Sequence, residues 1–220
     1  MTGSLKTLGT GWDARVARVF AAAELEVPDR SGFVDLLDQV VIWNRRHNLT
    51  AARDADELVD LYLADAAWLA KLGARLITDE DSPSRNAWVD VGSGGGAPGL
   101  PLALLLPRLH LTLVEPRDKR VAFLRSMLGR LNLTRAQVLR QRSDTLPDRS
   151  AAVALARATL PPPEWLREGA RLARRAVWVL LAKEPAPTLE GWRLEQLTPY
   201  AWPLTGFERS LALYVPDAED

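Results

Sequence analysis

The chain of 220 residues contains no cysteine and only two histidines. Without Cys there are no disulfides, no thiolate nucleophiles and no Cys-ligated zinc or iron–sulfur centres, and two His leave little for a metal site. The longest apolar run, Ala176 to Ala182, is far shorter than the ~20 residues that span a bilayer, and no basic segment followed by an apolar stretch marks the N-terminus. We therefore expect a cytoplasmic protein with no membrane segment and no metal.

The chain also lacks net charge, because its 28 basic and 28 acidic side chains cancel. The sum hides an uneven distribution: residues 108–183 hold 16 basic and 6 acidic side chains, a net +10, whereas residues 31–85 carry −4 and residues 184–220 carry −5. Of the 28 cations 24 are Arg, whose planar guanidinium suits bidentate phosphate contacts. Zero net charge thus does not exclude a nucleic-acid partner, although a solvated charged face is the alternative.

Helical periodicity dominates the N-terminal third. Leu36, Val40 and Trp43 recur at helical spacing, and Asp54 or Asp56 can cap a helix that follows. Gly73, Pro83 and the cluster of acids at 79–81 are typical of a loop. We therefore predict an N-terminal helical cap over residues 1–72, a connecting loop over 73–86 and a second domain over 87–220.

From Ala87 onwards short apolar runs alternate with helical stretches. The predicted strands are Ala87–Val91, Leu111–Glu115, Ala136–Leu139, Ala151–Leu155, Ala176–Leu181, Arg193–Tyr200 and Ser210–Val215, and the predicted helices are Leu100–Leu106, Lys119–Leu131 and Glu164–Leu172. Alternation of this kind builds βαβ units, whereas no helix separates the last two strands. The sequence therefore predicts an α/β fold, a doubly wound, mostly parallel seven-stranded sheet with an antiparallel edge hairpin.

A glycine-rich turn follows the first predicted strand and precedes a helix. It reads Asp90-Val-Gly92-Ser-Gly94-Gly-Gly96-Ala97-Pro-Gly. Doubly wound sheets bind ligands at the carboxyl ends of their strands, and glycine lets backbone approach a ligand closely. Pro98 suits the first turn of the next helix. A turn of this composition is by itself weak evidence for a particular ligand, so the acidic residues around it have to indicate which ligand it binds.

Acids follow the next two strands as well. Glu115 ends the second, where a carboxylate can accept both ribose hydroxyls, and Asp144 follows the third, where it can meet an adenine amino group. This pattern is typical of class I S-adenosylmethionine (SAM) methyltransferases, with the Rossmann-like fold described above. NAD enzymes usually space the turn as Gly-x-Gly-x-x-Gly, and the cationic sulfonium of SAM suits Asp90 better than a pyrophosphate does. A purely structural turn is the remaining alternative.

Three longer segments carry a more specific resemblance. They are Trp43-Asn-Arg-Arg-His-Asn-Leu-Thr-Ala51, Val89 through the glycine turn to Pro101, and Lys119-Arg-Val-Ala-Phe-Leu124. In these segments the chain resembles the bacterial 16S rRNA guanine-N7 methyltransferases, the family also called glucose-inhibited division protein B. The resemblance runs from about Ala14 to Val215.

The resemblance implies the cofactor, its contacts and the partner. SAM would contact the following residues: Gly92, Gly94, Gly96, Ala97, Glu115, Ser143, Asp144 and Arg157. A structural ion pair is the alternative role for Arg157. The implied reaction transfers a methyl group to N7 of a guanine in 16S rRNA, on the free RNA or the small ribosomal subunit, and we expect a monomer. Guanine N7 has a lone pair and no proton, so no catalytic residue is predicted.

The chain departs from the family at several positions on the expected substrate face. The family usually has Arg-His where this chain has Leu61-Tyr62, Ser at Ala66, a bulky apolar residue at Ala97, and Asp at Ala151 or Ala152. These departures leave two alternatives open. One is a diverged SAM-dependent methyltransferase that acts on another RNA or a small molecule, and the other is a SAM-binding protein without catalysis.

Overall fold

Three helices precede the sheet in a computed structural model that describes residues 5–78 and 82–217. Helix α1 spans Asp13–Ala22, α2 Ser31–His47 and α3 Ala55–Gly73, with short 3-10 turns at Gly9–Trp12 and Ala74–Leu76. Of the two predicted caps of α3, Asp54 is the one used: its carboxylate accepts a hydrogen bond from the Glu57 amide at 2.9 Å. The predicted acidic cluster at 79–81 lies outside the described residues.

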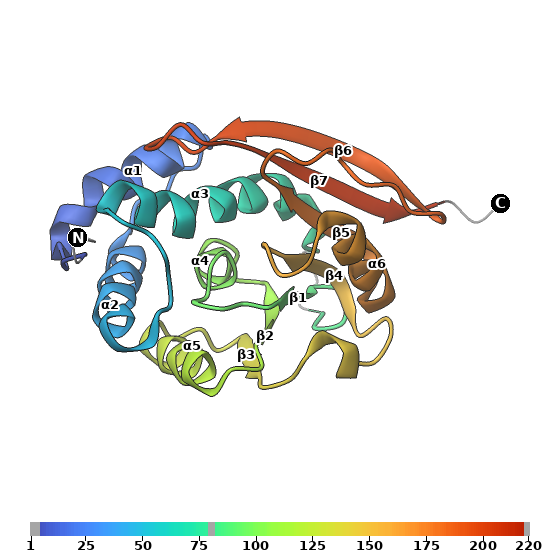
Figure 1. Cartoon of the computed structure of the whole chain (residues 1–220), viewed down its shortest axis with the longest axis horizontal. Helices are drawn as coiled ribbons and strands as arrows, with labels where there is room; N and C mark the ends of the chain where they lie inside the picture. The colour runs from blue at the N-terminus through green and yellow to red at the C-terminus, as the bar shows by residue number, and fades with distance from the viewer. Residues whose placement is uncertain (1–4, 79–81, 218–220) are drawn as a thin grey trace.

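The sheet contains seven strands in the order β3-β2-β1-β4-β5-β7-β6. They are β1 Ala87–Val91, β2 His110–Val114, β3 Ala136–Leu139, β4 Ala151–Ala156, β5 Ala173–Leu181, β6 Trp192–Ala201 and β7 Glu208–Pro216. The first five run parallel, and β7 pairs antiparallel with both β5 and β6. The predicted doubly wound sheet with an antiparallel edge hairpin is confirmed (Figure 1).

Helices pack against both faces of this sheet. Helix α4 spans Gly99–Leu105, α5 Asp118–Arg130 and α6 Pro162–Leu172, with a 3-10 turn at Ser143–Thr145. Successive residues of a strand face opposite sides, so Trp88 is buried among the residues of α1 to α5, while Val89 is buried with those of α6. The buried cluster that contains Trp88 also includes Trp12 of the N-terminal region and Leu213 of β7. The N-terminal helices and the sheet therefore share one core.

Some predicted boundaries are wrong by a few residues. Strand β5 begins at Ala173, three residues before its prediction, because Arg174 and Arg175 interrupt the apolar run. Both side chains instead donate hydrogen bonds to backbone carbonyls of neighbouring segments. Gly73 is the last residue of α3 rather than part of a loop. Pro98 lies just before α4, not in its first turn, after a cis peptide bond.

Candidate functional site

The glycine turn leaves β1 and folds over the carboxyl ends of the neighbouring strands. The Gly92 amide donates to the Val114 carbonyl at 2.8 Å, which ties the turn to β2. Gly92 has a φ of 69° and Gly94 a φ of 55°, both in the left-handed region that favours glycine. A Cβ at Gly92 would also collide with the side chain of Thr159, which follows β4. The turn thus needs glycine for its backbone angles and for its close approach to another loop.

A cavity of about 400 Å³ opens beside this turn. It is lined by Leu49, Leu61, Tyr62, Gly92, Ser93, Gly94, Gly95, Ala97, Glu115, Pro116, Arg117, Arg120, Arg157, Ala158 and Thr159. Five of the predicted cofactor residues are among them: Gly92, Gly94, Ala97, Glu115 and Arg157. The structure therefore brings together, in one cavity of a size usual for a small ligand, residues that are up to 65 positions apart.

Glu115 is held rigidly at this cavity. The residue is 2% exposed; one carboxylate oxygen accepts from the Gly94 amide at 3.0 Å, and the other accepts from the Arg117 amide at 2.9 Å. Arg120 lies 3.8 Å from the same carboxylate. Each carboxylate oxygen has a second lone pair, so a group with two neighbouring hydroxyls can still be bound.

Three predicted cofactor residues do not line the cavity. A Cβ on Gly96 would collide with Leu100 of α4, so this glycine permits close packing of the turn on its helix. The Ser143 carbonyl accepts a hydrogen bond from Arg171 of α6. Asp144 has a largely exposed side chain, and it forms an ion pair with Arg142 at 3.1 Å. The three remain predicted contacts that the shape of the cavity does not support.

Arg157 extends from the end of β4 toward helix α3. Its guanidinium donates a hydrogen bond to the Leu61 carbonyl and lies 3.5 Å from a carboxylate oxygen of Asp65. The ion pair considered in the sequence is therefore present, in a side chain that also lines the cavity. The two roles are compatible.

Tyr62, which was not among the predicted cofactor contacts, is a residue of this site. It is 1% exposed, yet its hydroxyl donates to the Gly95 carbonyl at 2.9 Å and so joins helix α3 to the glycine turn. Burial raises the pKa of this hydroxyl, so Tyr62 acts as a neutral donor. The one sequence signal for this role was that Leu61-Tyr62 stands where the family usually has Arg-His.

Asp90 lies beneath the turn rather than in the cavity. It is 1% exposed, and its Oδ2 has no hydrogen-bond partner among the described residues. A Cβ on Gly99 would come within 2.5 Å of that oxygen. Burial raises the pKa of Asp90 from 3.8 to about 7, and the positive charge of Arg157 opposes this shift. The acid expected to face a sulfonium is thus a buried group whose surroundings favour its neutral form.

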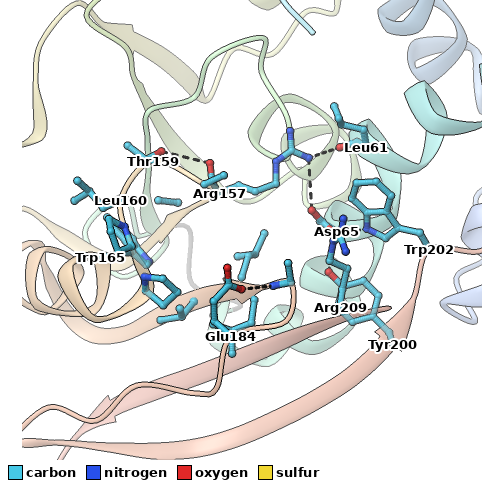
Figure 2. A pocket seen from close by; sticks show the side chains of 18 residues that line it. Leu61, Asp65, Arg157, Thr159, Leu160, Trp165, Glu184, Tyr200, Trp202 and Arg209 are labelled. Atoms are coloured by element: carbon cyan, nitrogen blue, oxygen red, sulfur yellow. Dashed lines mark hydrogen bonds and ion pairs between the residues drawn. The ribbon is translucent and has the colours of Figure 1, made fainter. Parts of the chain in front are cut away.

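A second, larger cavity of about 580 Å³ adjoins the first (Figure 2). The two cavities share Leu61, Arg157, Ala158 and Thr159. The larger one extends to Trp165 of α6, Glu184 after β5, and Tyr200, Trp202 and Arg209 of the edge hairpin. Two adjoining cavities at the carboxyl ends of the parallel strands provide room for two reactants side by side.

No group of three His, Asp or Glu that could hold a metal ion occurs in the part of the chain that the structure describes. Within the same residues, no helix is both long and apolar enough to cross a membrane.

The sheet order, the positive-φ glycine turn and the carboxylate after β2 are those of the class I SAM-methyltransferase fold. The residues that line the smaller cavity suit SAM, since Gly94 brings backbone without a side chain to its wall and Glu115 presents a carboxylate there. A family model described as rRNA small subunit methyltransferase G matches residues 29–185. The chain belongs to this family.

Curated relatives with the same description agree. A protein of Halorhodospira halophila is 39% identical over 138 residues, which cover 63% of this chain and 61% of that protein. One from Chloroflexus aggregans is 40% identical over 52% of this chain, and the match spans 44% of its length. One from Xanthomonas axonopodis is 30% identical over 91% of this chain and 93% of its own. All three are described as ribosomal RNA small subunit methyltransferase G.

Solved structures support the fold alone. A crystal structure described as an O-methyltransferase of Klebsiella pneumoniae has a TM-score of 0.63 at 16% identity, covering 96% of this chain and 100% of that one. A methyltransferase structure from Escherichia coli has a TM-score of 0.51 at 19% identity over 70% of this chain and 86% of its own.

Proposed function

We propose that this protein transfers the methyl group of SAM to N7 of a guanine in 16S rRNA. The observation that carries the proposal is the pair of adjoining cavities: SAM in the smaller one and a base in the larger one would meet at the wall that contains Arg157 and Thr159. Guanine is the acceptor that the family resemblance implies. Residues of the turn, with Glu115 and Arg157, would hold the cofactor.

The chemistry demands little from the side chains. The in-plane lone pair of N7 forms the new N–C bond while the S–C bond breaks and its electron pair stays on sulfur, so no proton has to be removed. Alignment of the two reactants supplies the rate enhancement, and such proximity is worth up to ~7–11 kcal/mol. This reaction suits a site whose side chains hold the two reactants in place and need not act as a general acid or a general base.

Cations near the smaller cavity support an RNA partner. Trp43 of α2 contacts Phe123 of α5 (ring centroids 5.4 Å apart), while Arg130 pairs with Asp35 at the other end of these helices. The two helices are therefore antiparallel, and the C-terminus of α2 meets the N-terminus of α5. Exposed cations gather at this junction: Arg45, Arg46, Arg117 and Lys119. RNA phosphates would bind there with strong salt dependence.

Incubation with labelled SAM tests the proposal. The substrates are small ribosomal subunits, and naked 16S rRNA, from a strain that lacks the modification, and the product is mapped by nucleotide. Label on N7 of one guanine supports the proposal. Label elsewhere selects the diverged methyltransferase, and SAM binding without any label in RNA selects the non-catalytic binding protein.

A charge-reversal pair tests the RNA surface. Arg45→Glu with Lys119→Glu should weaken RNA binding by about tenfold or more and flatten its dependence on salt, while SAM binding is kept, because neither residue lines the smaller cavity. Arg18→Glu, at an exposed position of α1 away from this junction, is the control for charge reversal. Arg125 is a further candidate, whereas Arg120 is less suitable because it faces Glu115. Equal RNA binding by the variant and the control would contradict this surface.

Three further properties belong to this proposal. The protein would act as a monomer, and in the cytoplasm, where small ribosomal subunits are found. The helical cap of residues 1–72, the loop 73–86 and the methyltransferase domain 87–220 would form its functional parts.

A further inference from the structure

Asp65 of α3 joins three elements around the larger cavity. Its carboxylate is 3% exposed, and one oxygen accepts hydrogen bonds from the Tyr200 hydroxyl at 2.6 Å and the Trp202 indole at 2.8 Å. The other oxygen lies 3.5 Å from the Arg157 guanidinium (Figure 2). Asp65 therefore connects the N-terminal helices, the edge hairpin and the loop after β4.

A second buried acid on the same helix provides a natural comparison. Asp60 is 0% exposed and also binds the hairpin loop, because its carboxylate accepts from the amides of Leu204 and Thr205 and from the Thr205 hydroxyl. Within the described part of the chain it makes no hydrogen bond or ion pair with Arg157, and it lines neither cavity. The two acids thus share the structural task of anchoring the hairpin, and they differ in their relation to Arg157.

The charge of Arg157 creates a difficulty that Asp65 resolves. SAM carries a positive sulfonium, and methylation of a neutral base at a ring nitrogen transfers that positive charge to the base. A guanidinium on the wall between the two cavities would repel the charge on both sides. An acid close to Arg157 and shielded from water offsets this repulsion. Asp65 lies 3.5 Å from the guanidinium, whereas burial favours the neutral form of Asp90, the other buried acid that interacts with the charge of Arg157.

We propose that Asp65 is a positioning residue that neutralises Arg157 on the wall shared by the two cavities. It thereby allows a cationic cofactor in one cavity and a cationic methylated base in the other. The inference rests on the proposed function, because it needs SAM in the smaller cavity. It goes further in assigning an electrostatic role to a side chain that lines the larger cavity but not the cavity proposed to hold SAM.

The test compares SAM with S-adenosylhomocysteine, which lacks the methyl group and the charge. Asp65→Asn keeps an oxygen that can accept from Tyr200 and Trp202 but removes the negative charge. Calorimetry should show that this variant loses about tenfold in affinity for SAM relative to its change for S-adenosylhomocysteine. Asp60→Asn, the matched control, should leave the ratio of the two affinities at its wild-type value. Thermal unfolding checks that both variants are folded.

Turnover gives a second measurement on the same variants. With saturating SAM and RNA, kcat of Asp65→Asn should fall by about tenfold or more, with little change in KM for RNA, while Asp60→Asn keeps its kcat. Equal loss of affinity for both ligands in Asp65→Asn, or the same ratio change in Asp60→Asn, would overturn the inference. Failure of the wild-type protein to bind SAM would instead refute the proposed function, and this inference with it.

Discussion

The buried carboxyl of Asp90 predicts an unusual dependence of stability on pH. Its pKa is about 7 in the folded protein against a model-compound value of 3.8. The shift is upward, so between pH 4 and 7 the folded state holds a proton that the unfolded state has lost. The free energy of unfolding should therefore fall as pH rises through this window and level off above pH 7.

The size of the effect follows from the difference in pKa. About three pH units at 1.36 kcal/mol each give about 4 kcal/mol as the full cost of ionising Asp90 in the fold. Asn is a neutral analogue of the protonated acid. Asp90→Asn should match the wild type near pH 4 and exceed its stability by up to about 4 kcal/mol at pH 8.

Urea unfolding at half-unit steps from pH 4 to 8 measures this difference. Subtraction of the two curves isolates Asp90 from the other titrating groups, because they are present in both proteins. Gly129→Ala is the control, because it lies at an open position of α5 where a Cβ meets nothing within 4 Å. Its stability should differ from that of the wild type by the same amount at every pH. A flat difference between wild type and Asp90→Asn across the range would refute a buried acid of raised pKa.

Three other substitutions test the cofactor site by calorimetry with SAM. Gly92→Val should abolish detectable binding, because the side chain meets Thr159 and φ is positive; near-normal affinity would contradict the turn as the binding element. Tyr62→Phe should weaken binding about fivefold, as expected for one lost hydrogen bond to Gly95, and an unchanged affinity would limit Tyr62 to packing. Asp144→Ala should weaken binding if this exposed acid closes on the adenine, and no change would remove it from the site.

Local patterns were sufficient to predict the fold. Each parallel strand is a short apolar run bordered by polar residues, and the Gly-rich turn marks the end of the first strand, where the candidate site lies. The start of β5 was missed, since Arg174 and Arg175 satisfy distant carbonyls that no local pattern contains. A strand that begins with charged residues resembles a loop in sequence.

The candidate site was predicted only where it is local. Gly92 and Glu115 lie within or next to recognisable strand ends. Leu49, Tyr62 and Thr159 reach the same cavity from other elements, and only tertiary packing places them there. Sequence spacing carries no information about that packing. The partnership of Asp65 with Arg157 joins residues 92 positions apart for the same reason.

Helix α3 presents three consecutive contacts within little more than one turn. The Leu61 carbonyl meets Arg157, the Tyr62 hydroxyl meets Gly95, and Asp65 meets the hairpin. A helix rotates by about 100° per residue. One inserted or deleted residue early in α3 would therefore turn all three groups away together, so the helix should keep a fixed length from Asp54 to Asp65 in relatives of this protein.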